Sequence, residues 1–253
     1  MNSQEMEWLL KEKYRGEKSD AFFADCKRLA LGEPLAYLIG HSPFLDCTIW
    51  LDGKPLIPRP ETEYWVAEAI KVIQGGQTMS LGIGEHTPHI LDLCAGSGCI
   101  GIAVAKALPE AHVDFGEIDV RLLPTIEKNL KENTIPLKRC NIVHTNLFSE
   151  VNKQYDFILS NPPYIDETLE RTEASVVKHE PYVALFGGKD GLEVIKKIIE
   201  QAPAHLTTGG QLWLEHEPEQ SETIIQLAEK VEFSATTHKD QYGVERYSVL
   251  VLQ

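Results

Sequence analysis

The sequence has no long hydrophobic run and no basic leader. None of its apolar stretches approaches the ~20 residues that a membrane-spanning helix requires. The first eight residues contain two glutamates and neither lysine nor arginine, unlike the basic start of a secretory signal peptide. Hydrophobic residues make up 43% of the 253 positions, which is ordinary for a globular protein with a large core. We therefore expect a cytoplasmic protein that does not engage a membrane.

Paired cysteine motifs are absent as well. The five cysteines are odd in number and form no Cys-x-x-Cys sequence, and the nine histidines are scattered. An odd, unpaired set suits a reducing compartment, and the spacing typical of zinc ligands is missing. We expect neither a disulfide framework nor a bound metal, and we interpret Cys94 and Cys99 as small buried residues.

Basic residues are few and dispersed. Lysine and arginine number 24 against 38 acidic residues, the formal net charge is −14, and no Lys/Arg cluster exceeds two residues. Nonspecific nucleic-acid binding draws its free energy from phosphate neutralisation and counterion release. We therefore expect no direct nucleic-acid binding, and we expect the acidic surface to favour a partner with a basic tip.

The second half of the sequence alternates strand and helix patterns. Strands are expected near residues 90–93, 113–117, 142–144, 156–160 and 211–216, and helices near residues 99–107, 121–133, 190–201 and 218–231. Such alternation predicts an α/β fold with a parallel, doubly wound sheet. Two last strands, near residues 233–238 and 247–252, have no helix between them and are expected to pair as an antiparallel edge hairpin.

The first part of the sequence is less regular. Residues 5–31 are expected to form one or two short helices. Residues 44–57 alternate around Asp52-Gly53, which is a hairpin signal. A helix is expected after Pro60, and Gly75-Gly76 should end it and begin a linker to about residue 89.

A glycine-rich turn follows the strand at residues 90–93. Its small residues, at positions 94–98, let a backbone pass close to a bound ligand, but their spacing differs from the Gly-x-Gly-x-x-Gly of dinucleotide binders. Glu117 ends the next strand, 25 positions after Asp92. An acidic side chain there can accept hydrogen bonds from both hydroxyls of a ribose. Asp119 is the competing candidate for this role.

The sequence Asn-Pro-Pro-Tyr at residues 161–164 follows an apolar run that reads as a buried strand. Open α/β sheets place their chemistry at the carboxyl ends of strands. Two consecutive prolines remove backbone donors, so nearby carbonyls can point into a pocket as acceptors. Asn161 adds a side-chain carbonyl, and Tyr164 adds a flat ring face. The arrangement suits a planar NH₂ group; a plain proline-rich turn is the alternative.

In this order, the glycine-rich turn, the acidic residue and Asn-Pro-Pro-Tyr resemble the HemK/PrmC-type protein-(glutamine-N5) methyltransferases. That family methylates the glutamine of the Gly-Gly-Gln loop in class 1 peptide chain release factors. The resemblance covers residues 32–253 and is carried by residues 32–40, 56–63, 161–165, 179–181, 184–185 and 241–246. The Ile-Pro-Arg-Pro-Glu-Thr-Glu run at residues 57–63 is the specific segment, because Asn-Pro-Pro-Tyr is shared with many amino-group methyltransferases.

The resemblance implies a Rossmann-like class I methyltransferase domain at residues 59–253, after a short helical region (1–43) and a β-hairpin linker (44–58). It also implies S-adenosylmethionine as the cofactor, S-adenosylhomocysteine as its product, and class 1 release factors as partners. The cofactor-binding residues implied are Asp92, Cys94, Ala95, Gly96, Ser97, Gly98, Glu117, Leu147 and Asn161. The catalytic residues implied are Asn161, Pro162 and Tyr164, and the substrate-binding residues are Asn161, Pro162, Pro163, Tyr164, Glu180 and Arg59.

The chain departs from the family pattern at four points. A longer helical bundle usually precedes the Gly-Glu-Pro segment, whereas 31 residues precede it here. The usual Gly-Thr-Gly-Thr-Gly turn becomes Cys-Ala-Gly-Ser-Gly, and the usual aspartate of the second strand is Glu117. Asn146 stands where an acid is expected near the adenine, and Leu147 stands where an aromatic residue is common.

The chemistry that we infer is in-line transfer of a sulfonium methyl group to a carboxamide nitrogen. An amide nitrogen is a poor nucleophile because its lone pair is delocalised into the carbonyl. The Asn161 side-chain oxygen and the Pro162 carbonyl are expected to accept its two N–H bonds, while Tyr164 stacks on the amide plane. Positioning of this kind can supply up to ~7–11 kcal/mol, so no strong general base is required.

Several roles stay open from the sequence alone. Arg59 and Glu61 either shape a substrate channel or, for the glutamate, favour the start of the next helix. Glu180 either braces the Asn-Pro-Pro-Tyr loop or contacts the substrate. Residues 215–217 either line the rim of a pocket or form a plain strand end, and we favour the strand end. Two other functions also stay open: an adenine-N6 methyltransferase, since a flipped adenine presents a planar NH₂, and a noncatalytic cofactor-binding scaffold.

Overall fold

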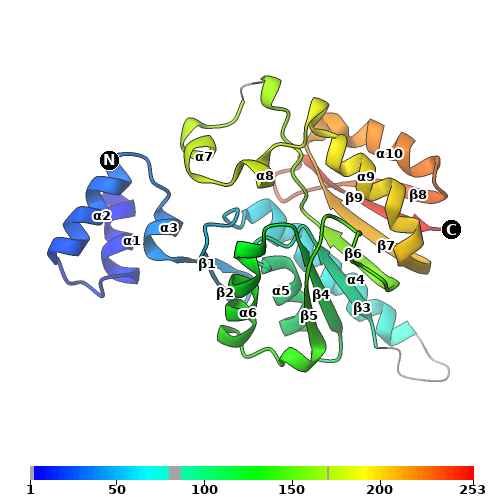
Figure 1. The fold of residues 1–253 in the computed structure, drawn as a ribbon, viewed down its shortest axis with the longest axis horizontal. Helices are drawn as coiled ribbons and strands as arrows, with labels where there is room; N and C mark the ends of the chain where they lie inside the picture. The colour runs from blue at the N-terminus through cyan, green and yellow to red at the C-terminus, as the bar shows by residue number, and fades with distance from the viewer. Residues whose placement is uncertain (1–2, 80–86, 170) are drawn as a thin grey trace.

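The computed structural model describes residues 3–79, 87–169 and 171–253, which contain a seven-stranded sheet (Figure 1). The strand order is β5-β4-β3-β6-β7-β9-β8. The strands are β3 (His89–Leu93), β4 (His112–Glu117), β5 (Cys140–His144), β6 (Tyr155–Ser160), β7 (Leu206–Glu215), β8 (Phe233–Lys239) and β9 (Glu245–Leu252). Strands β3 to β7 pair in parallel, whereas β9 is antiparallel to both β7 and β8. The predicted parallel sheet with an antiparallel C-terminal hairpin is therefore confirmed.

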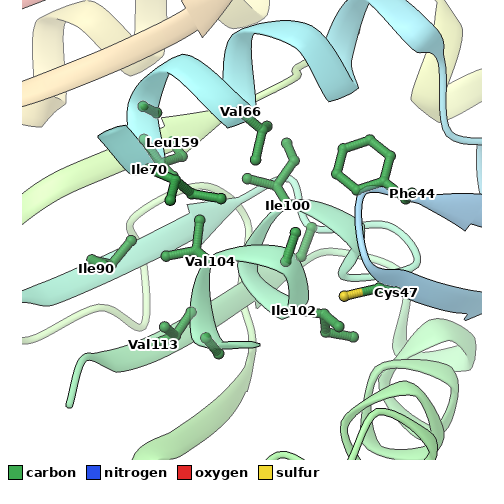
Figure 2. Close-up of a cluster of buried hydrophobic side chains, with 14 of the residues drawn as sticks. Phe44, Cys47, Val66, Ile70, Ile90, Ile100, Ile102, Val104, Val113 and Leu159 are labelled. Carbon is green, nitrogen blue, oxygen red and sulfur yellow. The ribbon is translucent and has the colours of Figure 1, made fainter. Parts of the chain in front are cut away.

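Helices cover both faces of this sheet. They are α4 (Pro60–Met79), α5 (Cys99–Ala107), α6 (Leu123–Glu132), α9 (Glu193–Gln201) and α10 (Ser221–Glu229). Two short helices, α7 (Ala174–His179) and α8 (Tyr182–Leu185), lie in the segment between β6 and α9. Successive strand residues point to opposite faces, so Ile90 packs with α4, α5 and α6, while Leu91 packs with α9 and α10. Figure 2 shows the first cluster, in which Val66 of α4 and Ile100 of α5 lie close to each other.

The predicted hairpin exists, but its turn lies elsewhere. β1 (His41–Phe44) and β2 (Cys47–Trp50) pair antiparallel, and residues 45–46 connect them. The prediction that Asp52-Gly53 is the hairpin turn is therefore wrong, and these two residues form a separate turn after β2. The side chains of Phe44 and Cys47 pack in the core beside α4 and α5 and so anchor the hairpin there (Figure 2).

Side chains of α6 explain why Asp52-Gly53 does not form the hairpin turn. Asn129 donates from Nδ2 to the Trp50 carbonyl at 3.0 Å, and its Oδ1 accepts from the Trp50 N–H at 2.7 Å. Asn133 makes the same pair of bonds with Thr48. Thr125 Oγ1 donates to the Asp52 carbonyl at 2.6 Å. The Asp52 turn is therefore docked on α6, which also holds the backbone of β2.

Helix α4 is longer than expected. It runs through Gly75-Gly76 to Met79, so the prediction that these glycines end the helix is wrong. A glycine inside a helix costs about 1 kcal/mol relative to alanine. Burial of a large apolar side chain contributes about 1.5–3 kcal/mol, so the fully buried Trp65 and the buried Ile73 outweigh that cost. The rest of the predicted linker, residues 80–86, lies outside the described residues.

Three short helices precede the hairpin: α1 (Ser3–Glu12), α2 (Asp20–Ala30) and α3 (Leu35–Ile39). The first two agree with the prediction for residues 5–31, and the third was not expected. In Figure 1 these helices lie at the opposite end of the molecule from the C-terminus.

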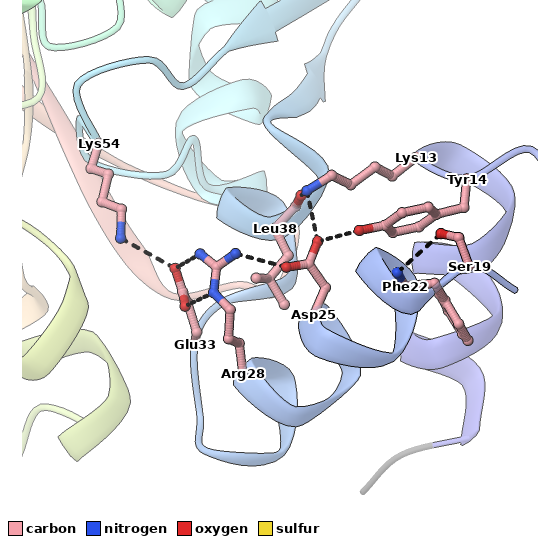
Figure 3. Close-up of polar contacts among 9 residues, drawn as sticks. All are labelled: Lys13, Tyr14, Ser19, Phe22, Asp25, Arg28, Glu33, Leu38 and Lys54. Carbon is pink, nitrogen blue, oxygen red and sulfur yellow. Dashed lines mark hydrogen bonds and ion pairs between the residues drawn. The ribbon is translucent and has the colours of Figure 1, made fainter.

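A buried aspartate links these helices to one another. Asp25 of α2 is 5% exposed and accepts hydrogen bonds of 2.7 Å from Lys13 Nζ, Tyr14 OH and Arg28 Nη1 (Figure 3). Burial alone would raise the pKa of Asp25, but these hydrogen bonds together lower it below the usual value. Lys13 Nζ also donates to the Leu38 carbonyl of α3 at 2.6 Å, so the network joins all three helices.

Within the part of the chain that the structure describes, no helix is long and apolar enough to cross a membrane.

Candidate active site

Three predicted site segments meet at one edge of the sheet, because they follow neighbouring parallel strands. The glycine-rich turn follows β3, Glu117 ends β4, and residues 161–164 follow β6. In the sheet, β3 lies between β4 and β6. The carboxyl ends of adjacent parallel strands meet at the same edge. The structure thus brings together segments that are far apart in the sequence.

The glycine-rich turn closes on Glu117. The Gly96 N–H donates to Glu117 Oε2 at 2.6 Å, and Gly96 has a φ of 57°, in the left-handed region that favours glycine. A Cβ at Gly96 would meet no atom within 4 Å, so the backbone here borders open space. Gly101 serves packing instead, because a Cβ there would lie 2.4 Å from the ring of Phe115.

Asp92 supports the turn from inside the core. Its Oδ2 accepts from the Gly101 N–H at 2.8 Å, and the side chain is fully buried. Its Oδ1 has no hydrogen-bond partner among the described residues. Burial raises the pKa of Asp92 to about 8, because no positive group offsets the loss of solvent.

A cavity of about 280 Å³ lies against the glycine-rich turn. Five of the predicted cofactor residues line it: Cys94, Gly96, Glu117, Leu147 and Asn161. The other four, Asp92, Ala95, Ser97 and Gly98, do not line it. Asn146 also lies in its wall, beside Leu147, which has a φ of 52°.

Two carboxylates, Glu117 and Asp119, line this cavity. Arg121 engages both oxygens of Asp119, through Nε at 2.9 Å and Nη2 at 2.6 Å, and this contact lowers the pKa of Asp119. Glu117 is 6% exposed and accepts hydrogen bonds from the backbone N–H groups of Gly96 and of Asp119, the latter at 2.8 Å. Each of its oxygens keeps a second lone pair for a ligand. The geometry thus favours Glu117 as the acceptor for a ribose.

A second cavity, of about 530 Å³, adjoins the first. Arg59, Glu61, Asn161, Pro162 and Tyr164 lie in its wall. Asn161 lines both cavities, whereas Pro163 lines only the smaller one. A ligand in one cavity can therefore meet a ligand in the other at Asn161.

Two acceptors at this junction are free. Asn161 Nδ2 donates to Thr62 Oγ1 at 3.1 Å, which leaves Oδ1 for another partner. Among the described residues, no group donates to Asn161 Oδ1 or to the Pro162 carbonyl. A carboxamide NH₂ has two donors that match this pair.

The hydroxyl of Tyr164 is hydrogen-bonded to a buried carboxylate, that of Glu215. This hydroxyl donates to Glu215 Oε1 at 3.0 Å, and Glu215, at the end of β7, is 1% exposed. Glu215 also accepts from Thr62 Oγ1 at 2.7 Å and from Trp65 Nε1 at 2.6 Å. Burial raises the pKa of Glu215, although these three hydrogen bonds oppose the rise. Glu215 therefore belongs to the wall of the site. The interpretation favoured from the sequence, a plain strand end, is not what the structure shows.

The backbone of the Asn-Pro-Pro-Tyr turn is held by residues 185–191. A Cβ at Gly191 would lie 1.9 Å from the Tyr164 carbonyl oxygen, and one at Gly187 would lie 2.5 Å from the Pro163 carbonyl oxygen. Gln220 Nε2 donates to the Tyr164 carbonyl at 2.9 Å. Sequence reasoning missed this support; the signal was the Gly-Gly-x-x-Gly run at residues 187–191.

Glu180 braces the segment that precedes α4. It accepts from Arg59 Nη2 at 2.6 Å and from the Ile57 N–H at 3.0 Å. Its side chain is buried and lines neither cavity, whereas Arg59 lines the larger one. These contacts tie Glu180 to the segment before α4 and not to the Asn-Pro-Pro-Tyr loop, so the two roles left open by the sequence stay predictions. The described residues contain no group of three or more His, Cys, Asp and Glu side chains that would hold a metal ion.

Two of the solved structures that resemble this chain are methyltransferases. One, from Pyrococcus furiosus, superposes with a TM-score of 0.59 at 19% identity and covers 90% of this chain and 97% of that chain. The other, a T. thermophilus 16S rRNA methyltransferase in complex with AdoMet and guanosine, has a TM-score of 0.55 at 19% identity and covers 84% of this chain and 49% of that chain. At this identity the likeness establishes the fold, that of class I methyltransferases.

Sequence comparison goes further than the fold. The family model "Methyltransferase small domain" matches residues 77–180. Eight curated relatives, 31–36% identical, are named release factor glutamine methyltransferase. The one from Rhodopirellula baltica is 34% identical over 235 residues, which cover 91% of this chain and 77% of that protein. Identity of this degree over most of both proteins shows that the chain belongs to the release factor glutamine methyltransferase family of S-adenosylmethionine-dependent enzymes.

Proposed function

We propose that this protein transfers the methyl group of S-adenosylmethionine to the side-chain nitrogen of the glutamine in the Gly-Gly-Gln loop of a class 1 release factor. The single observation that carries the proposal is the position of Asn161. It lines both cavities, and its Nδ2 is bonded to Thr62, which leaves its Oδ1 as an acceptor next in sequence to Pro162. A methyl donor in the smaller cavity and a carboxamide in the larger one would meet at this residue.

The smaller cavity suits S-adenosylmethionine. The open space beside Gly96 admits a ligand close to the backbone, and Glu117 offers carboxylate oxygens to ribose hydroxyls. Leu147 supplies an apolar wall where the adenine would pack. When bound, S-adenosylmethionine supplies an electrophilic sulfonium methyl group, and S-adenosylhomocysteine is the product.

The residues of the larger cavity hold and orient the amide. Asn161 Oδ1 and the Pro162 carbonyl accept the two N–H bonds of the glutamine, so that its nitrogen lone pair faces the smaller cavity. Tyr164, held by Glu215, provides the surface on which the amide plane rests. Such positioning contributes up to ~7–11 kcal/mol to lowering the barrier. The nitrogen becomes acidic as the new bond forms and then loses its proton to solvent.

The charge of the larger cavity favours a polypeptide over a nucleic acid. Its wall carries three arginines, at positions 59, 171 and 246, against seven acidic residues: Glu61, Asp166, Glu173, Asp190, Glu215, Glu217 and Glu219. Phosphate groups are repelled by such a wall, since nucleic-acid binding depends on phosphate neutralisation. A loop with basic flanking residues is attracted to it.

The test is to offer labelled S-adenosylmethionine together with release factor, DNA or tRNA in parallel reactions. We expect label in the release factor alone, at the Gly-Gly-Gln glutamine. Labelling of DNA or tRNA without labelling of the release factor would support the adenine-N6 alternative, and labelling of none would support the scaffold alternative.

A further inference from the structure

A continuous chain of hydrogen bonds runs from the substrate-facing amide into the core. Asn161 Nδ2 donates to Thr62 Oγ1 at 3.1 Å, and Thr62 Oγ1 donates to Glu215 Oε2 at 2.7 Å. Thr62 and Glu215 are each 1% exposed, so bulk water does not compete for these bonds. The three residues come from different parts of the fold: the loop after β6, the first turn of α4 and the end of β7.

The direction of these bonds follows from the chemistry of Glu215. Trp65 Nε1 can only donate, and it occupies the same Oε2 atom at 2.6 Å. Tyr164 OH donates to Oε1 at 3.0 Å. A carboxylate that receives three donors acts purely as an acceptor. The single proton of the Thr62 hydroxyl is therefore committed to Glu215.

Thr62 can then only accept from Asn161. The two ends of an asparagine amide are nearly equal in size, so shape alone does not decide which end faces the substrate. An accepting oxygen at Thr62 selects the NH₂ end, and the carbonyl end is left to point into the site. If the amide were reversed, two oxygens would face each other at Thr62, and an NH₂ would face the NH₂ of the substrate.

We propose that Glu215, acting through Thr62, is a positioning residue that fixes the side-chain amide of Asn161 with its oxygen toward the substrate. The inference rests on the proposed function, because it concerns the same acceptor. Neither Glu215 nor Thr62 takes part in the transfer itself.

The three donors around Glu215 support its role as an acceptor. Burial raises the pKa of Glu215, and these three hydrogen bonds and the nearby Arg246 of β9 oppose that rise. Glu217 also lines the larger cavity, and its carboxylate lies 3.5 Å from Arg246 Nη1. Two further titratable neighbours are the Tyr164 hydroxyl and the Cys99 thiol at the start of α5, and burial raises the pKa of each.

The test compares two substitutions at one position. Thr62→Val keeps the shape of the side chain and removes the hydroxyl, whereas Thr62→Ser keeps the hydroxyl. We expect Thr62→Val to lower kcat at least tenfold, with the Kd for S-adenosylmethionine changed less than twofold. We expect Thr62→Ser to recover most of the rate lost in Thr62→Val. Thr236→Val, on the exposed face of edge strand β8, is the matched control and should retain the wild-type kcat.

Three results would overturn the proposal. A kcat of Thr62→Val within threefold of wild type would show that the hydroxyl is not needed. Equal loss in Thr62→Val and Thr62→Ser would show that packing, not the hydroxyl, matters. Loss confined to cofactor affinity would place Thr62 in a different role. If Thr62→Val does not fold, Thr62→Cys replaces it, because a thiol is a weak acceptor, and a rate equal to that of Thr62→Ser would likewise overturn the proposal.

Failure of the proposed function gives a different result. In that case the wild-type protein does not label the release factor at all, whereas failure of the positioning role leaves the wild type active and Thr62→Val equally active.

Discussion

Arg59, in the wall of the larger cavity, forms an ion pair with the buried Glu180, with Arg59 Nη2 2.6 Å from Glu180 Oε1. The Glu180 side chain is 1% exposed, whereas that of Arg59 is 33% exposed, so the two partners differ in how well water can replace the contact. The pair ties the segment that leads into α4 to the segment between α7 and α8, which are 121 positions apart.

Loss of Arg59 should therefore cost more than loss of an ordinary surface cation. Arg59→Met leaves the buried Glu180 carboxylate with a single donor, the Ile57 N–H, and breaking a buried pair in this way costs about 3–5 kcal/mol. Urea unfolding measures the change. Lys71→Met, which breaks the exposed Lys71–Glu68 pair, is the control and should cost less than about 1 kcal/mol. Equal effects of the two substitutions would mean that Glu180 is solvated.

Asn161→Ala should abolish methyl transfer while the protein stays folded. The substitution removes the side-chain acceptor at the junction of the two cavities and leaves the Pro162 carbonyl in place. Cofactor affinity should fall only modestly, because Glu117 is untouched. Single-turnover transfer of labelled methyl and thermal unfolding are the measurements. A variant that turns over near the wild-type rate would refute the proposed mechanism.

Glu117→Ala should weaken S-adenosylmethionine binding by roughly 1–3 kcal/mol, the value of a lost charge-assisted hydrogen-bonded pair. Asp119→Ala is the matched control, and it should change the affinity little because Arg121 already engages the Asp119 carboxylate. Titration calorimetry measures both. If Glu117→Ala leaves the affinity for S-adenosylmethionine unchanged and Asp119→Ala clearly lowers it, then Asp119 and not Glu117 binds the ribose.

Stability should depend on pH through Asp92, whose pKa burial raises to about 8. The folded protein binds this proton more tightly than the unfolded chain, where an aspartate has a pKa of about 3.9. The resulting stabilisation is complete below about pH 4 and is lost as the pH rises through about 8. Relative to Asp92→Asn, which does not titrate, the free energy of unfolding of the wild type should fall across this window. Urea unfolding without cofactor checks this, and a constant difference would contradict the raised pKa.

The sheet could be predicted from the sequence because its strands are short apolar runs and several of them are followed by a helix of recognisable spacing. The hairpin turn could not, because Asp52-Gly53 carries the local turn signal while the contact that decides its position comes from Asn129 and Thr125, more than seventy positions away. The prediction of where α4 ends was wrong for a related reason. Glycine inside a helix costs only about 1 kcal/mol relative to alanine, and burial of apolar side chains upstream in α4 outweighs that cost at Gly75-Gly76.

The site was partly predictable for the same physical reasons. Asn161, Glu117 and the glycine-rich turn follow strands, so their order in the sequence indicates their meeting at one sheet edge. The signal from Glu215 was ambiguous, because a carboxylate at a strand end looks the same in the sequence whether it faces water or three donors. Its role depends on Thr62 and Tyr164, which reach it from distant segments.

The central claim is that the substrate is a glutamine carboxamide, and one measurement tests it most directly. Three release factors, carrying glutamine, glutamate or asparagine at the Gly-Gly-Gln position, are incubated with labelled S-adenosylmethionine, and the label is mapped by peptide mass spectrometry. Glutamine should be methylated. Glutamate should not, because it lacks the donors and carries a charge toward two acceptors. Asparagine, one methylene shorter, should react much more slowly, since transfer tolerates little misplacement. Equal labelling of all three would contradict the account.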